Sequence, residues 1–193
     1  MAHVLDELTV FDPDGQAIRL GQLWAERTAV LVFVRHFGCL FCKEQIATLG
    51  PLRGRVRSLG AELVVIGNGT VEQARAFRDD PQGTGPFPLF TDPTGQAYCA
   101  MGMRRGRRSV LTLRLLKHVV RAWRQGFRQT DVAGDALQQG GVVIVAPTGV
   151  ELYRFISREA GDHPAASSIL AALDNSQLSS LRSQVSSLTE TSR

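Results

Sequence analysis

The amino-acid sequence predicts an α/β fold in which a central mixed sheet is flanked by helices. Two stretches, 28–36 (TAVLVFVRH) and 61–67 (AELVVIG), are almost continuously apolar and β-branched, as is typical of strands covered on both faces. A helical pattern follows each of them, which indicates βαβ order and parallel pairing. A third stretch, 140–157, reads as two strands around a Pro-Thr-Gly turn, and such a hairpin is antiparallel. Both kinds of pairing together predict a mixed sheet.

The remaining elements follow in order along the chain. An N-terminal β-hairpin is expected over 8–24, because Asp-Pro-Asp-Gly at 12–15 favours a tight turn. Apolar residues at helical spacing predict a helix from 41 to about 59, with a kink at Gly50-Pro51. A shorter helix is expected over 71–80, immediately after the second central strand.

The C-terminal half continues the alternation of strands and helices. Residues 87–103 predict a short strand, a turn and a short helix that carries Cys99, and 163–173 predict an apolar helix with Pro164 near its start. The segment 174–193 is rich in serine and has little to bury, so we expect a mobile tail. The sequence therefore predicts one domain over 1–173 followed by that tail.

Composition is that of an ordinary globular protein. The chain has 193 residues, of which 44% are hydrophobic and 21% charged, and no apolar stretch approaches the roughly 20 residues of a membrane span. The first residues carry acidic groups and lack the pattern of a secretory signal, so we expect a cytoplasmic protein. In such a reducing compartment, a close pair among only three cysteines favours catalysis or metal binding over a structural disulfide.

Cys39 and Cys42 form that pair, in the order strand, CxxC, helix, strand. This is the arrangement of a thioredoxin-like fold. Backbone N–H groups and the dipole at a helix N-terminus stabilise a thiolate, and they lower a cysteine pKa from about 8.5 to roughly 3.5–7.5. The spacing places the second sulfur one helical turn away, where it can form a disulfide with the first. The pair is therefore a candidate redox-active dithiol.

Other interpretations of the cysteines remain open. A single CxxC supplies two of the four ligands of a structural zinc site, and both cysteines can also be core residues. Cys99 lies in an apolar segment, for which we expect a buried structural role. Arg35 and His36 precede the pair and are candidates for tuning the thiolate, although a histidine at the end of a strand is often a packed residue.

The segment FVRHFGCLFCKE (33–44) resembles the AhpC/TSA antioxidant proteins of the peroxiredoxin-like 2 group. Further similar landmarks occur in the same order, namely GMRRG (102–106), GDALQQGGVVIVAP (134–147) and GDHPAASSIL (161–170). The resemblance implies a thioredoxin-like fold and thiol-dependent antioxidant or reductase activity. One branch of the group reduces prostaglandin endoperoxides.

Two departures from related families bear on the mechanism. Peroxiredoxins carry Pro-x-x-x-Thr-x-x-Cys, and alignment on Cys42 puts Cys39 at the threonine position. Thioredoxins have a cis-proline opposite the CxxC, where this chain has Gln-Gln-Gly-Gly at 138–141. The likeness to thioredoxins assigns the attacking thiol to Cys39, whereas the likeness to peroxiredoxins assigns peroxide attack to Cys42. We favour Cys39 for attack on disulfides and leave peroxide attack open.

A basic insertion is predicted at about 104–130. The range 104–129 carries nine Lys and Arg residues and no acidic residue, with apolar residues at helical spacing between them. This pattern indicates an amphipathic basic helix, either packed on the sheet with a solvated arginine face or in weak contact with an anionic membrane or an acidic partner. We do not expect nucleic acid binding, because arginine supplies twenty of the twenty-two basic residues along the whole chain and part of the density is compositional.

These observations predict a thiol oxidoreductase. Its CxxC is expected to reduce peroxides, endoperoxides or protein disulfides, with electrons from thioredoxin and NADPH or a similar thiol donor, and with no bound cofactor or metal. The competing hypothesis is a redox-insensitive adaptor that keeps the fold and signals through the basic helix.

Overall fold

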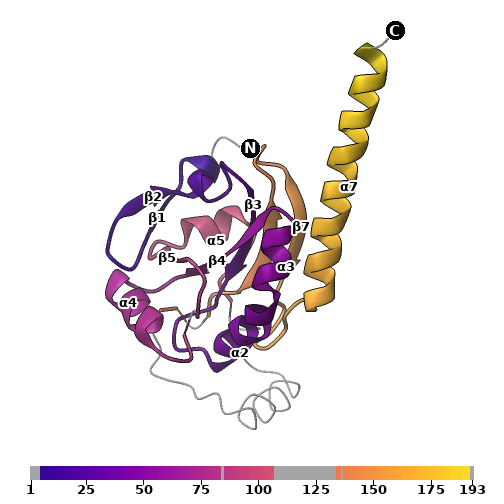
Figure 1. Cartoon of the computed structure of the whole chain (residues 1–193). Coiled ribbons are helices and arrows are strands. Elements are labelled where there is room, and N and C mark those ends of the chain that lie inside the picture. Colours follow the sequence, from indigo (N-terminus) through magenta and orange to yellow (C-terminus); the bar gives the residue numbers. More distant parts are fainter. Residues whose placement is uncertain (1–4, 84, 107–133, 136, 192–193) are drawn as a thin grey trace.

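The structure, a computed structural model, describes residues 5–83, 85–106, 134–135 and 137–191, with side chains as far as residue 179. Within these residues the chain forms one seven-stranded sheet in the order β2-β1-β5-β4-β3-β6-β7 (Figure 1). The strands are β1 (Thr9–Phe11), β2 (Ala17–Arg19), β3 (Thr28–Phe33), β4 (Ala61–Gly67), β5 (Leu89–Thr91), β6 (Gly141–Val145) and β7 (Glu151–Ile156).

The predicted mixed sheet is confirmed. Strands β3, β4 and β5 are parallel, whereas β6 pairs antiparallel with β3 and with β7. The predicted N-terminal hairpin is present as β1 and β2, and β1 joins the sheet beside β5. The hairpin's second strand is shorter than expected, because the chain turns into a 3-10 helix, η1 (Leu20–Leu23), directly after Arg19.

Helices follow the strands at the predicted places. They are α2 (Leu40–Leu49), η2 (Gly50–Leu52), α3 (Arg53–Ser58), α4 (Val71–Asp79), α5 (Gln96–Ala100) and α7 (Ala166–Thr191). The expected kink at Gly50-Pro51 is a 3-10 turn that divides α2 from α3. Proline lacks the N–H that an uninterrupted helix would use at this point.

The sheet is covered on both faces by separate apolar clusters. Alternate residues of β3 point to opposite sides: Val30 and Val32 pack in the cluster that contains α2, α3 and α7, whereas Leu31 and Phe33 pack in the cluster that contains α5. This explains why the sequence of β3 is apolar at every position. The CxxC helix, α2, therefore lies on one face of the sheet, and α5, which carries Cys99, lies on the other.

Helix α7 is longer than the sequence analysis expected. It begins at Ala166 and continues to Thr191, past the predicted end at 173, because residues 174–191 contain no glycine or proline to stop it. Ile169 and Leu173 are buried against the sheet, whereas Leu178 is 54% exposed. In Figure 1 the C-terminal half of α7 extends away from the body of the protein. The mobility of 174–193 remains a prediction.

The basic insertion lies almost entirely in 107–133, outside the described residues. Its two flanks are described and are joined to each other: Arg105 and Gln138 form an isolated antiparallel bridge, and the N–H of Gly106 donates to the Leu137 carbonyl at 3.1 Å.

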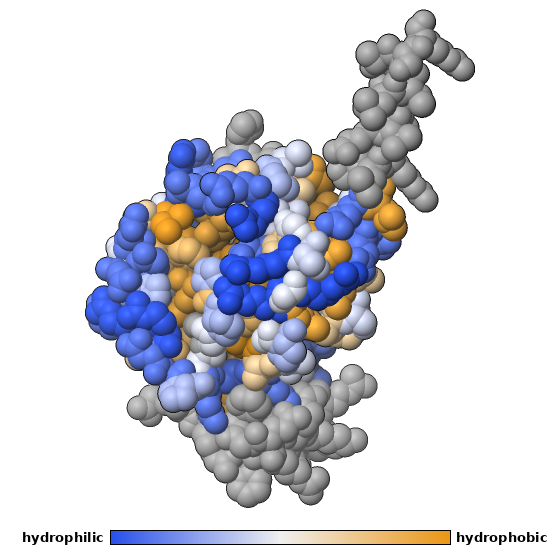
Figure 2. All heavy atoms as spheres, in the orientation of Figure 1, coloured by the Kyte–Doolittle hydropathy of each residue, from blue (hydrophilic) through white to orange (hydrophobic). Residues whose placement is uncertain are grey.

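The surface in Figure 2 is hydrophilic over α4, whose Ala74 and Phe77 face the core. Among the described helices, none has the length and apolar character needed to cross a membrane.

Phe37 anchors the loop that leads from β3 to the first cysteine. Its ring is 2% exposed, lies 5.2 Å from the ring of Phe77 and covers the backbone of Gly67. A Cβ atom at Gly67 would lie 2.1 Å from a ring carbon of Phe37. Only glycine at the end of β4 therefore allows the loop to settle on the sheet.

We predict that Gly67→Ala destabilises the fold by about 1–3 kcal/mol, because the added methyl group overpacks a rigid ring. Gly54→Ala is the matched control: it lies within α3 with no atom in contact range of its Cβ, so it should stabilise the fold by about 0.5–1 kcal/mol. Urea unfolding followed by circular dichroism measures both. Equal stabilities for Gly67→Ala and the unsubstituted protein would contradict this account of Phe37.

Candidate active site

The two cysteines sit at the start of α2, as predicted. Cys39 is the N-cap residue, with an extended backbone (φ −74°, ψ 116°), and its carbonyl accepts hydrogen bonds from the N–H groups of Cys42 at 3.1 Å and Lys43 at 3.2 Å. Cys39 is 4% exposed and Cys42 is 1% exposed, and both are free thiols. The residues between them, Leu40 and Phe41, are buried in the core.

The surroundings of Cys39 favour its thiolate. The strongest influence is a hydrogen bond from the Cys42 thiol; burial opposes it, and the N–H groups of Cys42 and Phe41 and the charge of Arg35 add to it. Together these lower the pKa of Cys39 to about 7. Close to half of this thiol is therefore ionised at neutral pH.

Cys42 has the opposite character. Burial raises its pKa well above the ordinary value, and the hydrogen bond to Cys39 and the negative charge of that sulfur raise it further. The N–H of Arg35, 3.3 Å from the Cys42 sulfur, only partly offsets these effects. One thiol of the pair is thus poised to ionise, while its neighbour holds its proton and donates it as a hydrogen bond.

Arg35, a candidate for tuning the thiolate, lies close enough to both sulfurs for its charge to favour the ionised form of each. Its side chain is buried, and its Nε donates to the Gln138 carbonyl at 3.2 Å. Gln138 begins the Gln-Gln-Gly-Gly segment before β6, which the resemblance aligns with the cis-proline of thioredoxins, and the described residues contain no cis peptide bond. Arg35 therefore links the thiol pair to the segment before β6.

His36 is buried as well, but it acts differently. Burial is the main reason that its pKa falls to about 4; the charge of Arg35 lowers it further, and Asp135 opposes the change. The imidazole is therefore uncharged at neutral pH, and its charge does not contribute to the thiolate. Its backbone carbonyl does contribute to the loop, because it accepts the N–H of Cys39 at 3.1 Å.

Two residues of the site were not identified from the sequence. The Asn68 side chain donates to the carbonyls of Arg35 at 2.7 Å and Asp135 at 3.2 Å, and it accepts the N–H of Asp135 at 3.0 Å. His163, from the loop before α7, bonds through Nε2 to the Phe41 carbonyl at 3.0 Å. Both contacts join segments far apart in the chain, so no local pattern could reveal them.

The expectation for Cys99 was wrong. Cys99 is exposed, on α5, which packs on the face of the sheet away from the CxxC. Its neighbour Tyr98 is the buried residue: its hydroxyl bonds to the carbonyls of Val34 at 2.6 Å and Ile66 at 2.9 Å. In a helix of five residues the sequence gives too little periodicity to decide which side chain faces the core.

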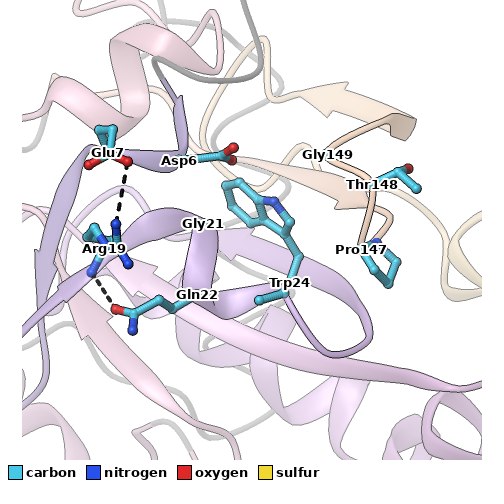
Figure 3. Close-up of a pocket in the computed structure, with 10 residues that line it drawn as sticks. Asp6, Glu7, Arg19, Gly21, Gln22, Trp24, Pro147, Thr148 and Gly149 are labelled. Carbon is cyan, nitrogen blue, oxygen red and sulfur yellow. Dashed lines mark hydrogen bonds and ion pairs between the residues drawn. The ribbon is translucent and has the colours of Figure 1, made fainter.

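The pocket in Figure 3 is remote from the thiols. It is lined by Asp6, Arg19 and Trp24 on one side and by Pro147–Gly149 on the other. Val145, just before the latter segment, pairs with Ala29 at the start of β3, whereas the cysteines follow the end of β3. The pocket and the CxxC therefore lie at opposite ends of the central strand.

Comparison with known proteins identifies the family of the chain. Residues 48–159 match the family described as AhpC/TSA antioxidant enzyme, a match that begins after both cysteines. Over 181 residues the chain is 31% identical to the thioredoxin-like protein AAED1, chloroplastic, of Arabidopsis thaliana, covering 89% of this chain and 72% of that protein. It is 32% identical over 184 residues to human Peroxiredoxin-like 2C, covering 88% and 79%.

A further relative is the prostamide/prostaglandin F synthase of Sus scrofa, which is 33% identical over 165 residues and covers 82% of this chain and 80% of its own length. Among solved structures, Peroxidoxin BcpB from Mycobacterium tuberculosis superposes with a TM-score of 0.64 at 18% identity, covering 87% of this chain and 92% of that chain. The latter similarity concerns the fold alone. The chain belongs to the AhpC/TSA antioxidant family, in its peroxiredoxin-like 2 group, and has the thioredoxin-like fold of the peroxiredoxins.

Proposed function

We propose that the chain is a thiol oxidoreductase in which Cys39 is the nucleophile and Cys42 the resolving thiol. Membership of the antioxidant family supports the class of activity. The observation that carries the assignment of roles is that the pKa values of two adjacent thiols shift in opposite directions. The pKa of Cys39 is lowered to about 7, whereas that of Cys42 is raised. A nucleophile needs a thiolate, and a resolving thiol needs only to reach the sulfur that has reacted.

The proposed cycle with a peroxide consumes two electrons from the thiols. The Cys39 thiolate attacks one peroxide oxygen, the O–O bond breaks, and the departing alkoxide takes a proton and leaves as an alcohol. Cys39 is then a sulfenic acid. The Cys42 sulfur attacks it, a disulfide forms and water leaves with the Cys42 proton. The balance is one peroxide and two thiols in, one alcohol, one water and one disulfide out.

Two other substrate classes follow the same logic. With a cyclic endoperoxide both oxygens remain on the product as hydroxyls, and the name of the related prostamide/prostaglandin F synthase supports this class. With a protein disulfide, Cys39 forms a mixed disulfide that Cys42 resolves. A thioredoxin-type donor supplied by NADPH would return the pair to the dithiol by the same exchange, and this scheme uses no metal or organic cofactor. We also propose a cytoplasmic location, because this cycle needs a reducing compartment in which the dithiol is regenerated.

The position of Cys42 argues against its attacking first. In the peroxiredoxin alignment Cys42 would be the peroxidatic residue and a threonine would stand at 39, but here that position holds a second thiol whose sulfur accepts the Cys42 hydrogen bond. Cys42 is also the more buried of the two. Both properties favour Cys39 for attack on peroxides as well as on disulfides.

The first test concerns the ranking of the thiols, in a Cys99→Ser background that removes the exposed cysteine. With Cys42→Ser, which keeps a hydrogen-bond donor, Cys39 should be alkylated by iodoacetamide with an apparent pKa near 7. With Cys39→Ser, Cys42 should react at pH 7 roughly 50-fold more slowly, because almost none of it is ionised. Mass spectrometry over a pH series measures both rates. The reverse ranking would transfer the attack to Cys42, and two slow, unshifted thiols would count against a catalytic pair.

The second test concerns Arg35, whose charge helps both thiols to ionise. Arg35→Met should raise the apparent pKa of Cys39 and slow its alkylation several-fold at pH 7, since about one pKa unit is a tenfold change in ionisation. Arg35→Lys is the control that retains the charge and should stay closer to the unsubstituted protein. A pH profile of alkylation that is the same for Met, Lys and Arg at this position would remove Arg35 from the site chemistry.

The third test separates the enzyme from an adaptor. In a glutathione redox buffer, the Cys99→Ser protein should form and release a Cys39–Cys42 disulfide, detected as the loss and return of two hydrogens in intact mass. With thioredoxin, thioredoxin reductase and NADPH, organic hydroperoxides or a disulfide substrate should be reduced, and both Cys39→Ser and Cys42→Ser should abolish turnover. If no reversible disulfide forms at biological potentials, the adaptor hypothesis is favoured.

A further inference from the structure

His163 contacts the short stretch of backbone that separates the two thiols. It lies in the loop between β7 and α7, 122 residues along the chain from Phe41, and its Nε2 is 3.0 Å from the Phe41 carbonyl oxygen. A carbonyl oxygen can only accept a hydrogen bond, so the contact requires the hydrogen to be on Nε2. His163 is therefore a donor to the CxxC turn.

The bond acts on a peptide group that faces Cys39. The Phe41 carbonyl and the Cys42 N–H belong to one planar peptide unit, so fixing the oxygen also fixes the direction of the N–H. That N–H points back to residue 39: it donates to the Cys39 carbonyl at 3.1 Å and also stabilises the Cys39 thiolate. A donor at the oxygen polarises the peptide and strengthens the hydrogen bonds that its N–H donates, by about 10–30% per bond in such chains.

The loop that carries His163 is held in place independently of the thiols. The Asp162 carboxylate accepts the N–H of Arg158 at 2.9 Å, and the N–H of Asp162 donates to the Glu159 carbonyl at 3.2 Å. Gly161 has a φ of 82°, which favours glycine, and Pro164 restricts the backbone on the other side of the histidine. The imidazole is thus presented to α2 by a preformed turn.

We propose that His163 is a positioning residue for the thiol site, which orients and polarises the Phe41–Cys42 peptide so that its N–H supports the Cys39 thiolate. The proposal rests on the proposed function only in taking Cys39 as the nucleophile. His163 itself does not touch the sulfur, so it acts through the peptide. The groups that otherwise govern the ionisation of Cys39 are the Cys42 thiol, the Phe41 N–H and Arg35.

A cavity beside His163 makes the idea testable by chemical rescue. His163 lines a hollow of about 180 Å³ together with Glu44, Gln45 and Thr48 of α2. Removing the imidazole with His163→Ala enlarges this space next to the Phe41 carbonyl. A small imidazole molecule from solution can then enter and replace the lost donor.

The experiment measures alkylation of Cys39 across pH in the Cys42→Ser, Cys99→Ser background. His163→Ala should raise the apparent pKa of Cys39 and slow alkylation at about pH 6.5 by roughly 3- to 10-fold, since one pKa unit is a tenfold change below the pKa. The rates should converge near pH 10, where Cys39 is fully ionised. His163→Gln, which retains an N–H donor, should recover most of the loss. His163→Met keeps most of the volume without the donor and serves if the alanine variant does not fold; it should behave like His163→Ala.

Imidazole added at about pH 8 should accelerate the His163→Ala variant towards the unsubstituted protein, whereas 1-methylimidazole, which has no N–H when neutral, should not. An unchanged pH profile in His163→Ala and His163→Met overturns the proposal, as does equal rescue by both imidazoles. Rates that differ near pH 10 with the same apparent pKa also overturn it, because they indicate altered access. An ordinary, unshifted pKa for Cys39 with His163 present would overturn the proposed function together with this inference.

Discussion

The thiol site is governed by one electrostatic constraint: two sulfurs in contact, both removed from water, share a single negative charge. Two thiolates this close in a weakly polarisable interior would repel strongly, so one sulfur ionises only if the other keeps its proton. The start of α2 decides which one, because the backbone N–H groups of Phe41 and Cys42 are directed at Cys39. Arg35 favours ionisation of both sulfurs and therefore sets how readily the pair ionises, but not which member does so.

The rest of the fold positions that helix start. Strand β3 delivers the chain into the loop, Phe37 rests on the glycine backbone at the end of β4, and Tyr98 ties the ends of both strands together through the Val34 and Ile66 carbonyls. A partly buried ion pair, in which the Lys43 ammonium lies 2.6 Å from the Asp80 carboxylate, fixes the same helix turn to the end of α4. The site is thus supported from both neighbouring strands and from the next helix.

The elements that the sequence predicts well are those with strong local patterns. Strands β3, β4 and β6 are apolar at nearly every position because both faces are covered, and the CxxC can be placed because strand, cysteines and helix are contiguous. The burial of Cys99 was mispredicted, since a single turn of helix does not reveal its inner face. Asn68 and His163 were missed because their roles depend on contacts with residues 33 to 122 positions away, which only the folded chain brings together. The length of α7 was underestimated because residues 174–193 have few apolar side chains to bury. Helix formation there depends instead on the absence of glycine and proline from 174–191.

The closed flanks of the insertion have an evolutionary consequence. Gly106 and Leu137 are hydrogen-bonded to each other, so the two ends of the segment between them lie side by side. The entropic cost of closing a loop grows only with the logarithm of its length, which means that segments of very different size can be accommodated at such a point without disturbing the sheet. The same point adjoins Gln138, whose carbonyl holds Arg35. A change in length at this junction therefore costs the fold little free energy. The junction lies next to the Gln138 carbonyl that holds Arg35, so such a change can alter the surroundings of the thiols while the thiols themselves stay the same.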